Sequence, residues 1–220
     1  MRLNEHQALT TTQILLVPYS THHVPTYHAW MEDEALRAAT ASDRLTLEEE
    51  YAMQRSWRTD RDKLTFILCL PAAECASKAV VEGRRDEVER MVGDVNLFLY
   101  EVDDDDDDDD DDDEGTRLSN GASAQRSLIG ELELMIARPE HRRQGYGRAA
   151  LLTFMEYILL NWERIAAEYT ASEGGGARSP LAYLRVRINE TNASSIRLFT
   201  SVGFQQTTEK ANYFGELELR

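Results

Sequence analysis

The stretch from Leu128 to Leu160 constrains the fold most, because it joins a strand pattern, a glycine loop and a helix pattern without interruption. From 128 to 136 the side chains alternate with a period of two, which is typical of a β-strand with two different faces. Gly145 and Gly147 follow in the loop, and the apolar run from Ala149 to Leu160 predicts a helix. One strand face carries Leu132, Leu134 and Ile136, and the other carries Glu131, Glu133 and Met135.

Gly145 and Gly147 have a physical use at the start of a helix. Because they lack side chains, they leave backbone N–H groups uncovered, and unpaired donors together with the helix dipole attract phosphate. The pattern predicts an anion-binding cradle. A plain tight turn is the alternative that a glycine pair before a helix also allows.

A second block lies further along the chain. Residues 181–187 predict a strand, Asn189 to Asn192 a turn and residues 193–201 a helix, which Gly203 and Phe204 close. The loop of the first block, from Arg142 to Gly147, resembles the acyl-coenzyme A signature of the GNAT superfamily of acetyltransferases. The second block resembles that superfamily's other motif, which here consists of Asn192, Ser195, Phe199 and the final Gly203-Phe204 pair.

The resemblance extends over most of the chain to the N-acetyltransferase 9-like branch of this superfamily. It implies a GNAT fold of the α/β (α+β) class, with a mixed, mostly antiparallel sheet of about seven strands flanked by helices. The sheet is expected to splay between its fourth and fifth strands, the Leu128 and Leu181 strands. The segments that carry the resemblance include Leu16–Tyr19, His23-Val24, Tyr27-His28, Trp30-Met31, Leu45–Gln54, Met91–Phe98 and Gly130–Ala137.

The resemblance also implies a bound co-substrate, acetyl-coenzyme A, with no metal. Backbone amides from Arg143 to Arg148 are expected to hold its pyrophosphate, while Ile136 and Ala137 pair with its pantetheine arm. Asn192 and Ser195 are read either as cofactor contacts or as ordinary residues of the helix and its cap. The full set of expected cofactor-binding residues is Ile136, Ala137, Arg142, Arg143, Gln144, Gly145, Tyr146, Gly147, Arg148, Asn192, Ser195 and Phe199.

Two carboxylates are candidates for the general base. Glu131 and Glu133 share the polar face of the strand that would flank the thioester, and Glu131 is preferred because some GNAT members carry a base there. The alternative is that both are exposed or pair with arginines. Phe199 departs from the family pattern, since many members have a tyrosine there that protonates the leaving thiolate. Tyr146, Ser195 or a water molecule would have to substitute for it.

The function implied is N-acetyl transfer from acetyl-coenzyme A to an amine, either an N-terminal or a lysine amine of a protein or peptide. Trp30, Trp57 and Tyr213 are candidates for lining the acceptor groove, although aromatic residues at helical spacing are more often core residues. The alternative function is that of a catalytically weak binding or scaffold protein with a GNAT fold, for example one associated with the cytoskeleton.

Charge and composition narrow the remaining choices. The net charge of −16 becomes −5 without the eleven consecutive aspartates from Asp103 to Asp113, and such a chain lacks the basic surface that nucleic acids need. We expect one domain, residues 1–220, with a disordered acidic loop at 103–127. Met1 to Thr12 lacks a signal-peptide pattern and no long apolar run follows. This indicates no membrane partner and an intracellular, cytoplasmic protein, with entry into the nucleus left open.

The remaining elements follow from shorter signals. Ile14 to Val17 predicts a strand that Pro18 ends, and residues 27–36 predict a helix. Thr46 and Glu49 form a capping-box pattern that should open a helix from Leu47 to Thr59. Residues 65–70 and 92–100 predict two neighbouring strands, and the two cysteines, Cys69 and Cys75, have no metal-ligand spacing.

Overall fold

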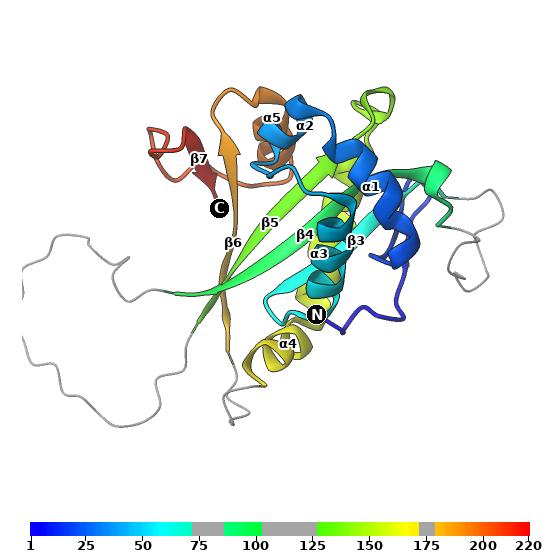
Figure 1. The fold of residues 1–220 in the computed structure, drawn as a ribbon. Coiled ribbons are helices and arrows are strands. Elements are labelled where there is room, and N and C mark those ends of the chain that lie inside the picture. Colours follow the sequence, from blue (N-terminus) through cyan, green and yellow to red (C-terminus); the bar gives the residue numbers. More distant parts are fainter. Residues whose placement is uncertain (72–85, 103–126, 172–178) are drawn as a thin grey trace, which may run out of the picture.

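The computed structural model describes residues 1–71, 86–102, 127–171 and 179–220 (Figure 1). Cys75, most of the insertion at 72–90 and all of the predicted acidic loop except Ser127 lie outside the described residues. Among the helices of the described residues, none is both long and apolar enough to span a bilayer.

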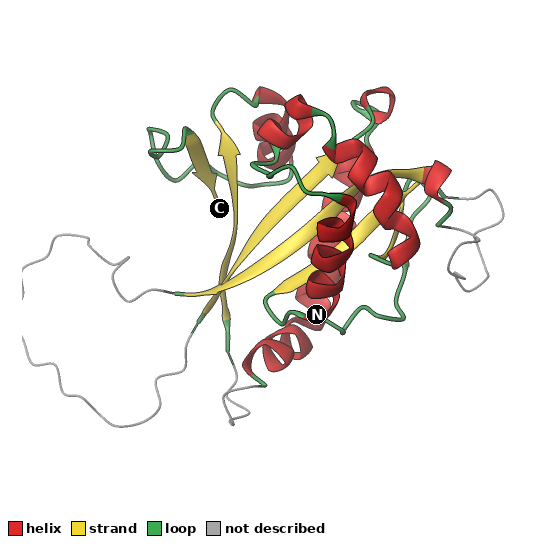
Figure 2. Ribbon diagram, in the orientation of Figure 1, coloured by secondary structure: helices red, strands yellow, loops and turns green. Residues whose placement is uncertain are grey.

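The centre of the molecule is a seven-stranded sheet in which the strands follow one another in chain order (Figures 1 and 2). All neighbouring pairs are antiparallel except β5 and β6, which run parallel. This confirms the expected mixed sheet. The strands are β1 (Leu9–Thr10), β2 (Leu15–Pro18), β3 (Lys63–Cys69), β4 (Met91–Glu101), β5 (Leu128–Ile136), β6 (Leu181–Asn189) and β7 (Glu216–Leu219).

The parallel pair, β5 and β6, is where the sheet splits. The two strands pair only from Leu128 with Leu181 to Glu131 with Arg185, after which β6 pairs with β7 instead. The split therefore lies where it was expected, between the Leu128 and Leu181 strands. These are the fifth and sixth strands rather than the fourth and fifth, because the two-residue strand β1 was not anticipated.

Two apolar clusters cover the two faces of the sheet. Figure 1 shows α1 and α3 on one side and α4 on the other. The α4 side takes Leu132 with partly buried Leu134 and Ile136, and the α1 and α3 side takes Met135, which confirms the alternation in β5. The helices are α1 (Val24–Met31), α2 (Glu34–Ala39), α3 (Leu47–Thr59), α4 (Tyr146–Thr170) and α5 (Ala193–Ser201), with 3-10 turns η1 (Thr21–His23), η2 (Val88–Arg90) and η3 (Pro139–His141).

Several predicted boundaries are correct and others need revision. Thr46 and Glu49 form both hydrogen bonds of the capping box that begins α3, and the helix has the predicted bounds. The stretch 27–36 forms parts of two helices, because the Asp33 side chain accepts hydrogen bonds from the backbone of Ala35 and Leu36 and begins a new one. Pro18 is the last residue of β2 rather than the residue that ends it. The helix α4 is longer than predicted, since buried Ile165 and Ala166 continue its apolar face.

Gly93 on β4 allows a close approach to β5 beside the split. A Cβ atom at this position would lie 1.8 Å from the backbone oxygen of Met135. We expect Gly93→Ala to lower the free energy of unfolding by about 1–3 kcal/mol, because β4 and β5 would have to move apart. Chemical denaturation measures this, and an unchanged midpoint would show that the Met135 peptide can shift freely.

Candidate active site at the split in the sheet

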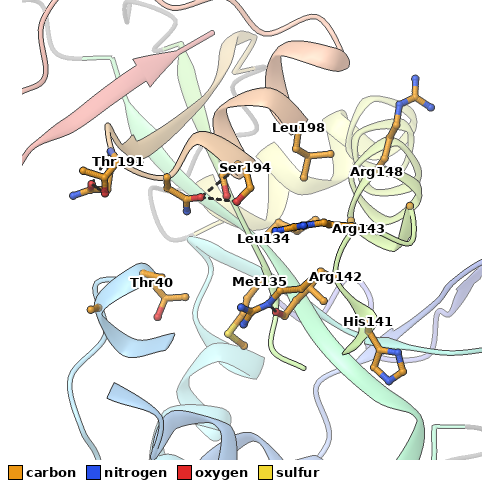
Figure 3. A pocket seen from close by; sticks show the side chains of 18 residues that line it. Thr40, Leu134, Met135, His141, Arg142, Arg143, Arg148, Thr191, Ser194 and Leu198 are labelled. Carbon is orange, nitrogen blue, oxygen red and sulfur yellow. Dashed lines mark hydrogen bonds between the residues drawn. The ribbon is translucent and has the colours of Figure 1, made fainter. Parts of the chain in front are cut away.

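A cavity of about 810 Å³ opens where β5 and β6 separate (Figure 3). Three chain segments build most of its wall: the end of β5, the loop that leads into α4, and the start of α5. A fourth segment, the end of α2, closes it from the opposite side. The lining residues are Ala38, Ala39, Thr40, Leu134, Met135, Ile136, His141, Arg142, Arg143, Gly145, Gly147, Arg148, Asn189, Thr191, Asn192, Ser194, Ser195 and Leu198.

The loop before α4 has the backbone of an anion cradle. Gly145 is the N-cap of α4 with φ +87°, and Arg143 also has a positive φ, +60°. The first amides of the helix have no intrahelical acceptor, so their partial positive charge is available to a ligand in the cavity. A Cβ on Gly147 would lie 3.4 Å from a methyl group of Leu134 and from one of Leu198, so the helix packs closely on its neighbours. This donor set fits a phosphate-bearing ligand.

Arg142 ties this loop to the end of β5. Its Nε donates to the backbone oxygen of Ile136 at 2.9 Å, and a terminal nitrogen donates to that of Ala137 at 3.0 Å. The Ala137 N–H donates to Val92 at 2.9 Å. The guanidinium thus holds the carbonyls beside the cavity in place, and Figure 3 shows Arg142 close to Met135 while Arg148 points away from both.

Asn192 shapes the opposite wall at the start of α5. Its side-chain oxygen accepts hydrogen bonds from the Ser195 N–H at 3.2 Å and from the Ser194 hydroxyl at 3.0 Å (dashed in Figure 3). The residue therefore caps the helix while its neighbours line the cavity, so the cap and a ligand contact are compatible.

The two glutamates of β5 have different surroundings. Glu131 is buried and its Oε2 lies 2.7 Å from Arg185 Nε and 3.7 Å from Arg187 Nε. Glu131 and Arg185 also form the last paired position of β5 and β6. This carboxylate is committed to an ion pair at the branch point, so its environment favours a structural role.

Glu133 has no such partner among the described residues. Its side chain is exposed to solvent. Partial desolvation by the surrounding protein, followed by the negative charges of Asp94, Glu131 and Glu216, raises the pKa of Glu133 to about 7. A carboxyl group that titrates near neutral pH is suited to general base catalysis. Glu133 shares its strand face with Met135, which lines the cavity.

Asp94 on β4 adds a second perturbed carboxyl group on the same face. It is buried, and burial raises its pKa to about 6 against the opposing effect of hydrogen bonds from Asn96 and Tyr27. Asp94 is not among the site residues predicted from the sequence. The available signal is the pair of polar residues, Asp94 and Asn96, inside the largely apolar strand run 92–100.

Comparison with known proteins agrees with this geometry. The family model described as an acetyltransferase (GNAT) domain matches residues 13–205. A protein from Schizosaccharomyces pombe, "N-acetyltransferase 9-like protein", is 38% identical over all of this chain and 97% of its own length. The chain belongs to the GNAT acetyltransferase family.

Other GNAT relatives support the assignment. A mouse protein, "Alpha/beta-tubulin-N-acetyltransferase 9", is 37% identical over all of this chain and 73% of its own length. A GNAT acetyltransferase from Bacillus anthracis has the same fold, with a TM-score of 0.58 at 11% identity over 97% of this chain and 96% of its own.

Within this GNAT fold the predicted site residues fall into two groups. The residues that line the cavity are Ile136, Arg142, Arg143, Gly145, Gly147, Arg148, Asn192 and Ser195. Outside its lining lie Ala137, Gln144, Tyr146, Phe199 and the two candidate bases, Glu131 and Glu133. Phe199 is buried in the apolar core, and its ring packs edge-on against Phe204 at 5.3 Å between centroids. Trp30, Trp57 and Tyr213 also lie outside the cavity lining, and Tyr213 is almost fully exposed.

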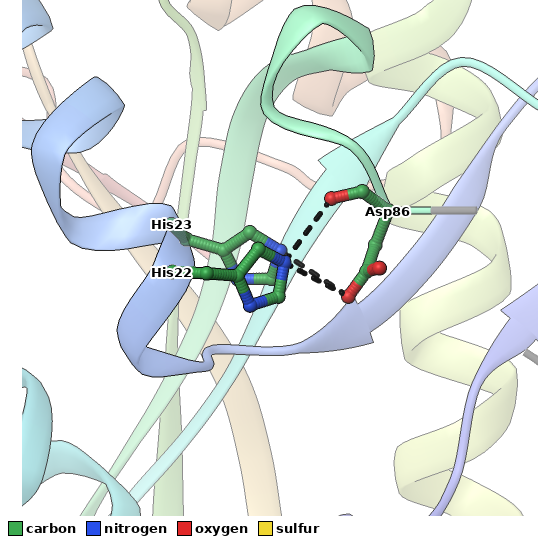
Figure 4. A group of neighbouring side chains, drawn as sticks. All are labelled: His22, His23 and Asp86. Carbon is green, nitrogen blue, oxygen red and sulfur yellow. Dashed lines mark hydrogen bonds and ion pairs between the residues drawn. The ribbon is translucent and has the colours of Figure 1, made fainter. Parts of the chain in front are cut away.

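A separate cluster, His22, His23 and Asp86, has the composition of a metal site (Figure 4). Asp86 Oδ2 lies 3.3 Å from His22 Nε2 and 3.4 Å from His23 Nε2. However, His23 Nδ1 accepts the backbone N–H of Ser20 at 3.1 Å. A neutral ring then carries its proton on Nε2, the atom that a metal would need, whereas metal-bound histidines donate their other N–H. The buried cluster is better explained as a hydrogen-bonded contact between η1 and the segment before β4.

This tautomer assignment predicts how the protein responds to metals. We expect a molar excess of zinc, or of a chelator, to leave the melting temperature unchanged, because neither changes the cluster. Asp86→Asn should lower the melting temperature, since it replaces the charged acceptor that faces His22 and His23 by a weaker, neutral one. Stabilisation by zinc that disappears in Asp86→Asn would contradict the assignment.

Proposed function

We propose that this GNAT acetyltransferase uses acetyl-coenzyme A and transfers its acetyl group to a primary amine of a protein or peptide. The observation that carries the proposal is the cavity at the split in the sheet. It places an anion-binding helix N-terminus beside the end of β5. Glu133, whose pKa is raised to about 7, lies outside the cavity lining, two residues before Met135, which lines the cavity and shares its strand face. The same cavity offers the pyrophosphate a set of backbone donors and the acyl arm the end of β5.

The reaction forms a C–N bond, breaks the C–S bond and moves protons. The amine nitrogen attacks the thioester carbon and loses a proton as the thiolate leaves. Glu133 is the proposed acceptor of that proton, because Glu131 is held by Arg185. Phe199 cannot protonate the leaving thiolate. The proton comes instead from solvent, which is sufficient because a coenzyme thiolate is a fairly good leaving group.

The names of related proteins support the choice of a protein amine as the acetyl acceptor. The mouse and fruit-fly proteins are named as α/β-tubulin N-acetyltransferases, and all of this chain aligns with each of them at 37% and 38% identity. A protein amine, either N-terminal or on a lysine, is therefore the acceptor to test first, with tubulin among the substrates. A scaffold protein with the same fold would bind the cofactor without turnover.

A substitution at Gly145 tests whether the loop before α4 binds the cofactor. Gly145→Glu should abolish acetyl-coenzyme A binding in calorimetry, because it places a negative side chain at the helix N-terminus and a non-glycine residue at φ +87°. Gly203→Glu is a matched control, since Gly203 also has a positive φ, is exposed and lies outside the cavity lining. Equal affinities in both variants would refute the loop assignment.

A substitution at Glu133 tests whether this residue is the general base. Glu133→Gln should reduce kcat roughly 100- to 10,000-fold with little change in the affinity for acetyl-coenzyme A, because the amide cannot accept the proton. In the unmodified protein, kcat/KM should rise with pH through about 7 as Glu133 ionises. Glu131→Gln is the control, and it should mainly lower stability by leaving Arg185 without its closest carboxylate. The base assignment is wrong if Glu131→Gln alone loses activity.

A further inference from the structure

Asp94 occupies an unusual place for a carboxylate. It lies on the face of β4 that meets α1 and α3, is 2% exposed, and is flanked along the sheet by Ile67 and Met135. Its Oδ2 accepts hydrogen bonds from the Tyr27 hydroxyl at 3.2 Å and from Asn96 Nδ2 at 3.0 Å. An aspartate in an apolar strand costs stability, so a catalytic use would account for its position.

Asn96 is oriented by this contact. Because its Nδ2 donates to Asp94, its Oδ1 is the free end of the amide, and this atom is buried without a hydrogen-bond partner among the described residues. A buried acceptor without a donor is rare in folded proteins and calls for an explanation. Asn96 lies directly opposite Glu133 on β5, and both side chains are on the same face.

We propose that Asp94 and Asn96 form a positioning pair behind Glu133. In this pair Asp94 supplies a neighbouring charge that keeps the glutamate ready to take a proton, and Asn96 Oδ1 accepts the O–H of the protonated glutamate. The inference rests on the proposed role of Glu133 as base. It assigns a function to two residues that touch neither the cofactor nor the acceptor.

Each proton transfer in this scheme has a defined donor and acceptor. The amine nitrogen loses a proton to the Glu133 carboxylate as the C–N bond forms, and the resulting carboxyl group donates its O–H to Asn96 Oδ1. Glu133 then releases the proton to solvent, which its exposed side chain reaches. The free acceptor on Asn96 is thereby used during turnover.

Other charged and titratable groups face this pair or Glu133 and contribute to any pH dependence. Tyr27 contacts Asp94 directly, and Tyr19 and Glu50 lie on its helical side. The groups near Glu133 are Tyr100 from β4, Glu131 from β5 and Glu216 from β7. Glu131 is paired in turn with Arg185 and Arg187 from β6.

Asp94→Asn removes the charge with little change in shape. Asp94 and Glu133 are diagonal neighbours, roughly 7 Å apart by sheet geometry, so their repulsion should be worth about 0.5–1 pH unit in a hydrated environment. The acidic limb of kcat/KM should move down by that amount. Asn96→Ala should move it in the same direction by less, because it removes the acceptor for the neutral carboxyl group.

Thr65→Val is the matched control. Thr65 lies opposite Asn96 on β3, and its hydroxyl is also buried without a described partner, so a contact of Thr65 with Asn96 is the competing explanation. Thr65→Val should leave the pH profile unchanged. If it reproduces the shift of Asn96→Ala, the amide serves packing between β3 and β4 and the proposal fails.

Carbon-detected NMR titration of the Glu133 carboxyl group separates this inference from the base assignment, because it needs no turnover. A midpoint in Asp94→Asn that falls by about 0.5–1 pH unit supports the coupling even if Glu133→Gln keeps its activity. An unchanged midpoint in a folded variant overturns it, whatever the activity shows. Thermal melting of each variant establishes that it is folded.

Discussion

The end of the hydrogen-bonded ladder between β5 and β6 is the constraint on which the site depends. Beyond Glu131 and Arg185 the strands separate, and β6 takes β7 as its partner. Only this separation lets the N-termini of α4 and α5 approach one cavity from opposite sides. The ion pair of Glu131 and Arg185 lies at the last paired position, so a side-chain contact reinforces the backbone at the point where the sheet branches.

This arrangement explains why two glutamates two residues apart have different surroundings. Their period of two makes them equivalent in the sequence, since both face α1 and α3. The difference comes from partners distant in the chain. Arg185 lies on β6 and reaches the first glutamate. The second, Glu133, lies beyond the last paired position, is exposed to solvent and feels the charge of Asp94 on β4. The family pattern favours Glu131 as the base, but it contains no information on these partners, on which the proposed choice of Glu133 rests.

The fold was predictable to the extent that local signals specify it. The capping box of Thr46 and Glu49 and the Asn192 cap correctly predict where α3 and α5 begin, because the partners lie within three residues of each other. The end of α4 depends on packing of Ile165 against the sheet, and its length was underestimated. The motif alone predicts that Phe199 contacts the cofactor, whereas its ring packs in the core against Phe204.

The two faces of the sheet divide stability and chemistry between them. The face under α4 is packed with apolar side chains, while buried polar groups gather under α1 and α3, among them Glu50, Thr65, Asp94 and Asn96. Each of these groups costs desolvation free energy that a methyl-bearing side chain would not. Because the apolar face carries the larger cluster, the protein tolerates this cost on the other face. Under the proposed role of Asp94 and Asn96, apolar replacements of these two residues should stabilise the fold and remove their effect on Glu133.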